Sequence, residues 1–115
     1  MLCTAATFDA THTTLAGITK TEVASGTGYT TGGQALTGIS VSTVLTNGAK
    51  FDANDVVWSA SSGAIAASYA IVYNDTDADD PPVAFVNFDG SKSAAAGTDF
   101  VIVWDSPGIF TLAVA

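Results

Sequence analysis

The chain has 115 residues, 48% of them hydrophobic, which is enough for one core and too short for separate catalytic and regulatory domains. Only 12% are charged: eleven acidic residues and three lysines, without arginine, give a net charge of −8 at pH 7. Neutralising phosphates requires clustered Lys and Arg, so this charge excludes a nucleic-acid-binding protein and argues against an anionic membrane surface.

The first residues and the single cysteine indicate the cellular compartment in which the protein is made. Met1 to Thr4 carry no positive charge and no long apolar run, so they do not resemble a signal peptide, and no stretch of the chain is apolar over the length of a bilayer. The single cysteine, Cys3, has no second cysteine for an internal disulfide. We therefore expect a protein that is made in a reducing cytoplasm or assembled there into something larger.

The first half of the chain contains two expected strands. Leu2 to Phe8 favours a strand, whereas Leu15 to Ala24 has an apolar spacing that fits neither a helix nor a strand cleanly and stays open. Gly38 to Thr43 alternates apolar residues with serine, which predicts a strand with one buried and one wet face. Asn47-Gly48 marks the turn after it.

The middle of the chain predicts a turn and three more strands. Residues 52–55 form a tight turn in which Asp and Asn bond the local backbone, and residues 56–58 begin a buried strand. Residues 68–73 and 83–88 predict a pair of strands, joined by the long acidic loop 74–82.

The C-terminal part predicts a hairpin. Residues 99–104 are expected to form a strand buried on both sides, because apolar residues occupy both of its faces. A turn at Ser106-Pro107-Gly108 would lead into a second strand over residues 109–114. Turn signals about every ten residues, without sustained 3.6-residue periodicity, predict an all-β fold: a single domain over residues 1–115, built as an antiparallel β-sandwich or a jelly-roll-like barrel.

The residues available for catalysis are few. His12 is the one histidine, and nothing in the sequence places Cys3 or a particular serine beside it. His12 lies in a polar stretch and is expected to be a solvated surface residue. The aspartates lie in expected turns, where Asp bonds the backbone, so we predict no catalytic residues.

Two motifs resemble ligand-binding loops without completing them. Asp75 to Asp80 begins like a calcium loop of the EF-hand type, but Asp80 stands where glycine is required and Val86 where a bidentate glutamate is required. A solvated acidic loop is the better interpretation, and an irregular cation site there is the alternative. Gly26 to Gly33 lacks the Lys-Ser/Thr ending of a phosphate loop and is interpreted as a twisting connection with positive φ at several glycines. No cofactor and no metal are otherwise expected.

Large aromatic residues are the candidates for a partner interface. Trp58, Trp104, Tyr69 and Tyr73 are core residues or interface anchors, and the sequence does not separate the two roles. So few charges with so many apolar residues indicate that part of the surface meets another subunit. The candidate interface residues are Tyr29, Trp58, Tyr69 and Tyr73.

A block of sequence resembles a known family. Residues 22–36 (EVASGTGYTTGGQAL) resemble the "EV-SGTGYT-GG-L" block of a family of tailed-bacteriophage virion proteins. Five further blocks follow in the family's order: FDANDVVW (51–58), ASYAIVYNDT (67–76), FVNFD (85–89), GTDFVIVW (97–104) and GIFTL (108–112). Ser68 stands where the family often has arginine, so no ion pair at that position is carried over.

The resemblance implies a non-enzymatic structural protein of the phage particle. The leading hypothesis is a head decoration, or cement, protein that binds the outer capsid lattice, is located on the capsid surface, and is assembled in the host cytoplasm. Its partners would be the major capsid protein and further copies of itself, with a trimer as one form. The alternative is a tail or tail-fibre module that binds a host receptor or glycan in a groove near Tyr29, Tyr69 or the Asp75 to Asp80 loop. A cell-envelope hydrolase is the third and weakest hypothesis.

Overall fold

The protein is all-β, as the sequence predicted. The computed structural model describes residues 1–44 and 47–113, and in these ranges it contains strands and no helix. Its arrangement into antiparallel sheets is consistent with the expected β-sandwich. The described strands are β1 (Leu2–Ala6), β2 (Lys20–Glu22), β3 (Ser40–Thr43), β4 (Gly48–Asp52), β5 (Val56–Ser59), β6 (Ile65–Tyr73), β7 (Pro82–Ala94), β8 (Asp99–Ile102) and β9 (Phe110–Ala113).

The chain, expected as one domain, divides into two compact units. Unit 1 comprises residues 1–33 and 58–100, and unit 2 comprises residues 34–57 and 101–115. Strands β5 and β8 pair with each other, and each passes from one unit into the other along the chain.

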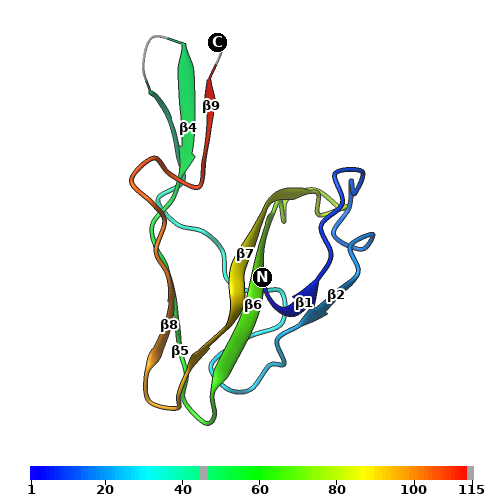
Figure 1. The fold of residues 1–115 in the computed structure, drawn as a ribbon, viewed down its shortest axis with the longest axis vertical. Coiled ribbons are helices and arrows are strands. Elements are labelled where there is room, and N and C mark those ends of the chain that lie inside the picture. Colours follow the sequence, from blue (N-terminus) through cyan, green and yellow to red (C-terminus); the bar gives the residue numbers. More distant parts are fainter. Residues whose placement is uncertain (45–46, 114–115) are drawn as a thin grey trace. The chain divides into compact units, whose positions relative to one another are not determined.

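Unit 1 is built on a four-stranded antiparallel sheet with the order β2-β1-β6-β7 (Figure 1). Strands β6 and β7 confirm the pair expected around the acidic loop, with Ile71 opposite Phe85. Both are longer than predicted, because β6 begins at Ile65 and β7 continues to Ala94 through a bulge. The strand expected over residues 2–8 is present as β1 but ends at Ala6, and β2 is the strand within the ambiguous segment 15–24.

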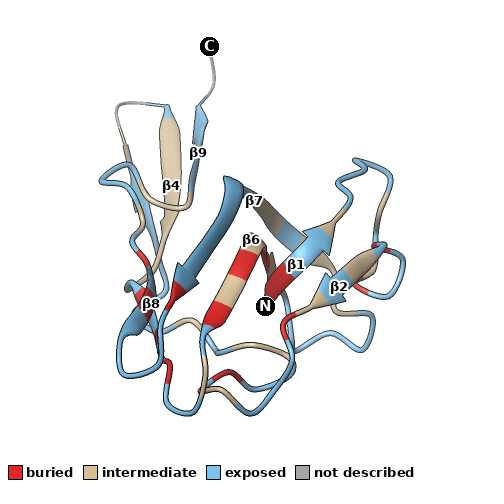
Figure 2. Ribbon diagram, turned by 60° about the horizontal axis from the view of Figure 1, so that its bottom comes forward, coloured by how far each residue is buried: buried red, intermediate tan, exposed pale blue. Residues whose placement is uncertain are grey.

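Both faces of this sheet are buried in unit 1, because consecutive residues such as Leu2 and Cys3 are both fully buried. One face carries a cluster of four buried residues, Cys3, Leu15, Ile18 and Ile71, which we call the core cluster. Figure 2 shows the buried residues, red, along β6 and at the start of β1. Leu15 and Ile18 belong to a turn and not to a regular element, which explains why their spacing fitted neither template.

The glycine-rich segment 26–33 confirms the interpretation as a twisting connection. Gly26, Gly28, Gly32 and Gly33 all have positive φ, between 88° and 114°. At Gly28 the backbone also passes so close to the Ser59 carbonyl that a Cβ would overlap it. Glycine is therefore required there both by conformation and by space.

Unit 2 contains a three-stranded antiparallel sheet with the order β3-β4-β9. Val41 lies opposite Phe51, which in turn lies opposite Phe110 on the far strand. Asn47 lies in a turn, as expected, and Gly48 begins β4. Residue 114, the last of the expected strand 109–114, lies outside the described residues.

Three expectations about this part of the chain are wrong. The C-terminal hairpin does not form, because β9 pairs with β4 and β8 pairs with β5. Instead, residues 103–109 form an irregular connection, and the Ile109 amide donates to the Phe51 carbonyl. The strand expected to be buried on both sides alternates instead: Phe100 and Ile102 are buried, whereas Val101 is exposed. The strand expected to be half-buried, β3, is exposed at all four residues.

Candidate partner-binding surface

One face of the β3-β4-β9 sheet is apolar and open. Residues directly opposite each other in an antiparallel sheet point to the same face, and alternate residues along a strand share a face. The register therefore places Val41, Phe51 and Phe110 in one row and Thr43, Ala49 and Leu112 in the next row of the same face. We call this set the apolar sheet face.

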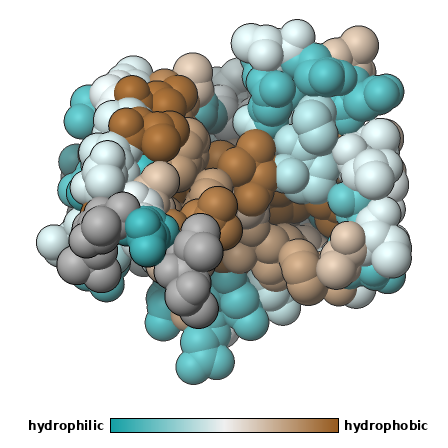
Figure 3. Space-filling model, turned by 90° about the horizontal axis from the view of Figure 1, so that it is seen from above, coloured by the Kyte–Doolittle hydropathy of each residue, from teal (hydrophilic) through white to brown (hydrophobic). Residues whose placement is uncertain are grey.

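The apolar sheet face is unusually exposed for its composition. Val41 and Leu112 are 73% and 72% exposed, and Phe110 is 43% exposed although its ring stacks on Phe51 at 5.3 Å between centroids. Figure 3 shows apolar side chains, brown, reaching the surface among hydrophilic ones in teal. Contiguous exposed apolar surface of this kind marks sites that bind another protein.

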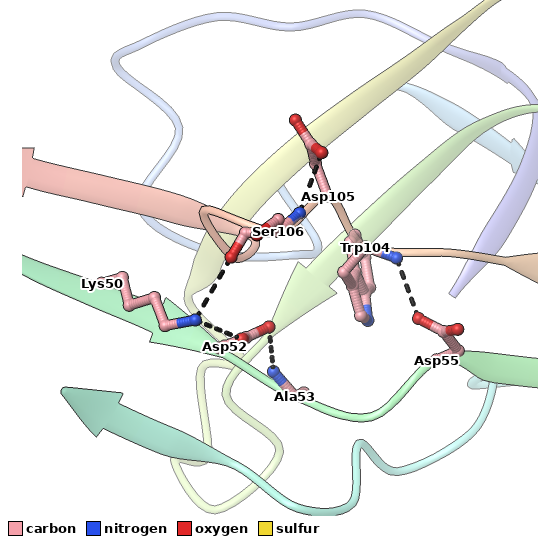
Figure 4. Close-up of polar contacts among 7 residues, drawn as sticks. All are labelled: Lys50, Asp52, Ala53, Asp55, Trp104, Asp105 and Ser106. Atoms are coloured by element: carbon pink, nitrogen blue, oxygen red, sulfur yellow. Dashed lines mark hydrogen bonds and ion pairs between the residues drawn. The ribbon is translucent and has the colours of Figure 1, made fainter. Parts of the chain in front are cut away.

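The opposite face of the same sheet is polar and is tied to the connection before β9 (Figure 4). Lys50 Nζ forms an ion pair with Asp52 Oδ2 at 3.0 Å and also donates to the Ser106 carbonyl at 3.3 Å. This hydrogen bond from Lys50 lowers the pKa of the Asp52 carboxyl. The Trp104 amide donates to Asp55 Oδ1 at 3.0 Å. These contacts hold the segment that leads into β9 and leave the apolar sheet face free of polar partners.

Two of the expected interface residues lie in the core of unit 1. Tyr29 and Trp58 are both buried, with their rings 6.1 Å apart, and the Trp58 ring also contacts Phe100. The expectation that they form a partner interface is therefore wrong, because neither offers surface to a partner. Trp58 has the core role that the sequence had left open.

Tyr29 is the centre of a buried hydrogen-bond network. Its hydroxyl accepts from the Leu2 amide at 3.0 Å and donates to Glu22 Oε1 at 2.7 Å. Glu22 Oε1 also accepts from the Gly32 amide at 2.6 Å. Burial and then the hydrogen bond to Glu22 raise the pKa of Tyr29 above its usual value. The network joins β1, β2 and the glycine-rich connection, so its role is structural.

Tyr69 and Tyr73, the other two expected interface residues, are half-buried on β6. Both pack against the core cluster, and the Tyr73 hydroxyl donates to the Gly32 carbonyl at 2.7 Å. Burial raises the pKa of Tyr73. The Tyr69 ring lies 5.5 Å from the ring of Phe85 on β7.

A pocket of about 310 Å³ opens beside the start of β7, and we call it the β7 pocket. His12 lines it together with Phe8, Ile18, Phe85 and other residues, and it is half-buried there rather than fully solvated. The Asp9 carboxylate at its rim accepts hydrogen bonds from the amide and hydroxyl of Thr11, which lower the pKa of Asp9.

Cys3 does not belong to the β7 pocket. It is fully buried in the core cluster, and burial raises the pKa of its thiol. A protonated thiol is a poor nucleophile, so the structure offers Cys3 no activation.

The acidic loop closes on itself. Asn74 Oδ1 accepts from the amide and hydroxyl of Thr76, and the Asn74 amide donates to the Pro81 carbonyl at 3.0 Å. Across the described parts of the chain, no group of three or more His, Cys, Asp or Glu side chains is placed to hold a metal ion.

The sequence did not single out the apolar sheet face or the β7 pocket. The alternation around Val41 was a usable signal, but it was interpreted with the apolar side turned inward. Phe110 and Leu112 alternate in the same way, and the register that joins them to Val41 depends on pairing between segments far apart in the chain.

Comparison with known proteins gives no relative. Neither a scan against models of protein families nor searches of curated proteins and of solved structures found a match. Within residues 1–44 and 47–113, no helix is both long and apolar enough to cross a membrane.

Proposed function

We propose that this chain is a non-enzymatic structural protein of a tailed-phage particle, a head decoration protein that binds the outer capsid lattice. In this proposal the apolar sheet face of β3-β4-β9 rests on the shell and bridges neighbouring major capsid subunits. The observation that carries the proposal is the exposure of this face, and the resemblance of about residues 20–115 to phage virion proteins supplies the class of partner.

The energetics suit binding to a repeated lattice. Burying a side chain such as Val41 or Leu112 contributes about 1.5–3 kcal/mol, so a few such residues give useful affinity at each lattice position. A protein that binds the assembled shell but not free subunits stabilises the shell by mass action. The net charge of −8 keeps the free chain soluble and away from packaged DNA.

The same proposal includes self-association on the shell, with a trimer as one form, and assembly in the host cytoplasm. It requires no cofactor. The state of the candidate nucleophile supports a non-enzymatic role, because Cys3 is buried with a raised pKa and does not line the pocket that contains His12.

Quantitative mass spectrometry of separated heads and tails from the purified phage particle tests this location. We expect the chain in heads at a fixed ratio to the major capsid protein. A few copies confined to tails would overturn the proposal and favour the tail or tail-fibre module. Absence from both fractions would exclude a virion protein of either kind.

A further inference from the structure

Strand β7 leaves one long edge of the unit 1 sheet unpaired. It has 13 residues, about twice the average length of a strand, and it is the last strand in the order β2-β1-β6-β7. Among the described residues, strand β6 is therefore its one neighbour in that sheet. An edge strand presents backbone N–H and C=O groups that another extended chain can pair with.

The first half of this edge lacks the usual protection against pairing. Residues 82–88 (PVAFVNF) contain no charged side chain. Pro82, at the start of the strand, has no amide to donate, and the other protective features begin only after residue 88: Asp89 and Gly90 have positive φ of 54° and 109° within the bulge, and Lys92 follows. Pairing is thus open along residues 83–88 and obstructed at Pro82 and beyond residue 88.

The β7 pocket adjoins this open edge. Its lining includes Pro82, Val83 and Phe85, so the same short segment forms both the edge and a wall of the pocket. Phe8 on the opposite side is 65% exposed, and its ring lies 5.5 Å from that of Phe85. A volume of about 310 Å³ accommodates one large apolar side chain. Strand addition with alternate side chains entering pockets is a common way of binding extended peptides.

Charge determines which occupant fits. Four aspartates, at positions 75, 77, 79 and 80, lie in the loop that leads directly into β7. The Leu15 amide fixes this loop by donating to the Asp80 carbonyl at 3.1 Å, next to the turn that carries Ile18 of the pocket. A second copy of a chain with charge −8 would be repelled here, whereas a segment with Lys or Arg would be attracted.

We propose that the open edge of β7 binds an extended segment of a partner protein that carries one large apolar side chain and adjacent Lys or Arg residues. The segment pairs with residues 83–88, its apolar side chain enters the β7 pocket, and its basic residues face Asp75 to Asp80. This inference deepens the proposed function and rests on it for the identity of the partner, which would be an extended arm of the major capsid protein.

Binding of three synthetic peptides to the purified full chain tests the inference without using a capsid. The first has two lysines followed by alternating leucine and threonine, the second replaces the lysines with glutamates, and the third replaces the leucines with serines. Fluorescence anisotropy at low salt is expected to show at least tenfold tighter binding of the first peptide than of either control. Equal binding of all three, or binding of none, would overturn the inference.

Matched variants locate the site. Val83→Lys places a charge on the edge and in the pocket, and Val101→Lys makes the same change at a β8 valine of matching exposure (44% and 45%). We expect Val83→Lys to weaken binding of the first peptide at least tenfold and Val101→Lys to leave it unchanged; equal effects would overturn the inference. The double variant Asp75→Asn and Asp79→Asn should weaken binding of the lysine peptide and should not weaken binding of the glutamate peptide.

Two further outcomes separate the alternatives. If sedimentation velocity shows that the chain self-associates and that Val83→Lys abolishes this, the edge is an interface between copies and the inference is wrong. If the lysine peptide binds as expected but the chain does not bind capsid shells, the edge site stands and the proposed function fails.

Discussion

Replacing Tyr29 with phenylalanine removes the hydroxyl that links the Leu2 amide to the Glu22 carboxylate in unit 1. The ring stays and keeps its contact with Trp58, so the change affects only the two hydrogen bonds of the hydroxyl. The Leu2 amide loses its acceptor in a place where Leu2 is fully buried. Glu22 keeps its bond from the Gly32 amide but loses the donor at 2.7 Å.

The expected cost follows from these two losses. A buried N–H without a partner costs about 1–3 kcal/mol, and a hydrogen bond to a charged group contributes about 1.5–3 kcal/mol. Because the two losses share one site and are not additive, we expect Tyr29→Phe to lower the free energy of unfolding by about 2–4 kcal/mol. Urea unfolding followed by tryptophan fluorescence and circular dichroism measures this directly.

Tyr69→Phe is the matched control, because the Tyr69 hydroxyl makes no hydrogen bond within the described residues and its ring also packs on the core. We expect this control to change stability by less than 1 kcal/mol. If Tyr29→Phe is no more destabilising than Tyr69→Phe, the buried network does not hold β1, β2 and the glycine-rich connection together.

Two further stability predictions concern unit 1. Gly28→Ala should be more destabilising than Gly26→Ala in the same urea assay. Both residues have positive φ, but only at Gly28 would a Cβ overlap another group, the Ser59 carbonyl. Equal losses of stability in the two variants would contradict this close approach. Stability should also fall as the pH rises above about 8.5, because burial raises the pKa of Cys3 in the folded chain, so the unfolded chain loses this proton first. The stability that the protonated Cys3 thiol contributes is fully present below that pH. Cys3→Ala should flatten the decline in stability between about pH 8.5 and 10. An unchanged slope would show that the decline does not come from Cys3.

Local patterns predicted the elements of unit 1 well. The apolar runs of β6 and β7, with the Asp- and Pro-rich loop between them, identified a strand pair because both signals lie within one stretch of chain. The glycines of segment 26–33 were interpreted correctly for the same reason, since positive φ is a property of single residues. The apolar spacing of Leu15 to Ala24 does not distinguish a helix from a strand, because Leu15 and Ile18 lie in a turn and pack into the core from there.

Long-range pairing was the part that sequence did not determine. A turn at Ser106-Pro107-Gly108 predicted a hairpin, but β9 satisfies its backbone on β4, more than fifty residues earlier in the chain. The apolar sheet face depends on that pairing, so its members could not be grouped beforehand. A large aromatic side chain is a candidate interface anchor, but its size alone does not distinguish a core residue such as Tyr29 from a surface residue.

The binding of the purified chain to undecorated capsid shells tests the central claim most directly. Co-sedimentation is measured for the natural chain, for Leu112→Asp on the apolar sheet face, and for Thr111→Asp on the opposite face of the same strand. We expect the natural chain to saturate the shells at a fixed ratio, Leu112→Asp to bind at least tenfold more weakly, and Thr111→Asp to bind within about threefold of the natural chain. No binding of the natural chain, or equal binding of all three proteins, would contradict the account.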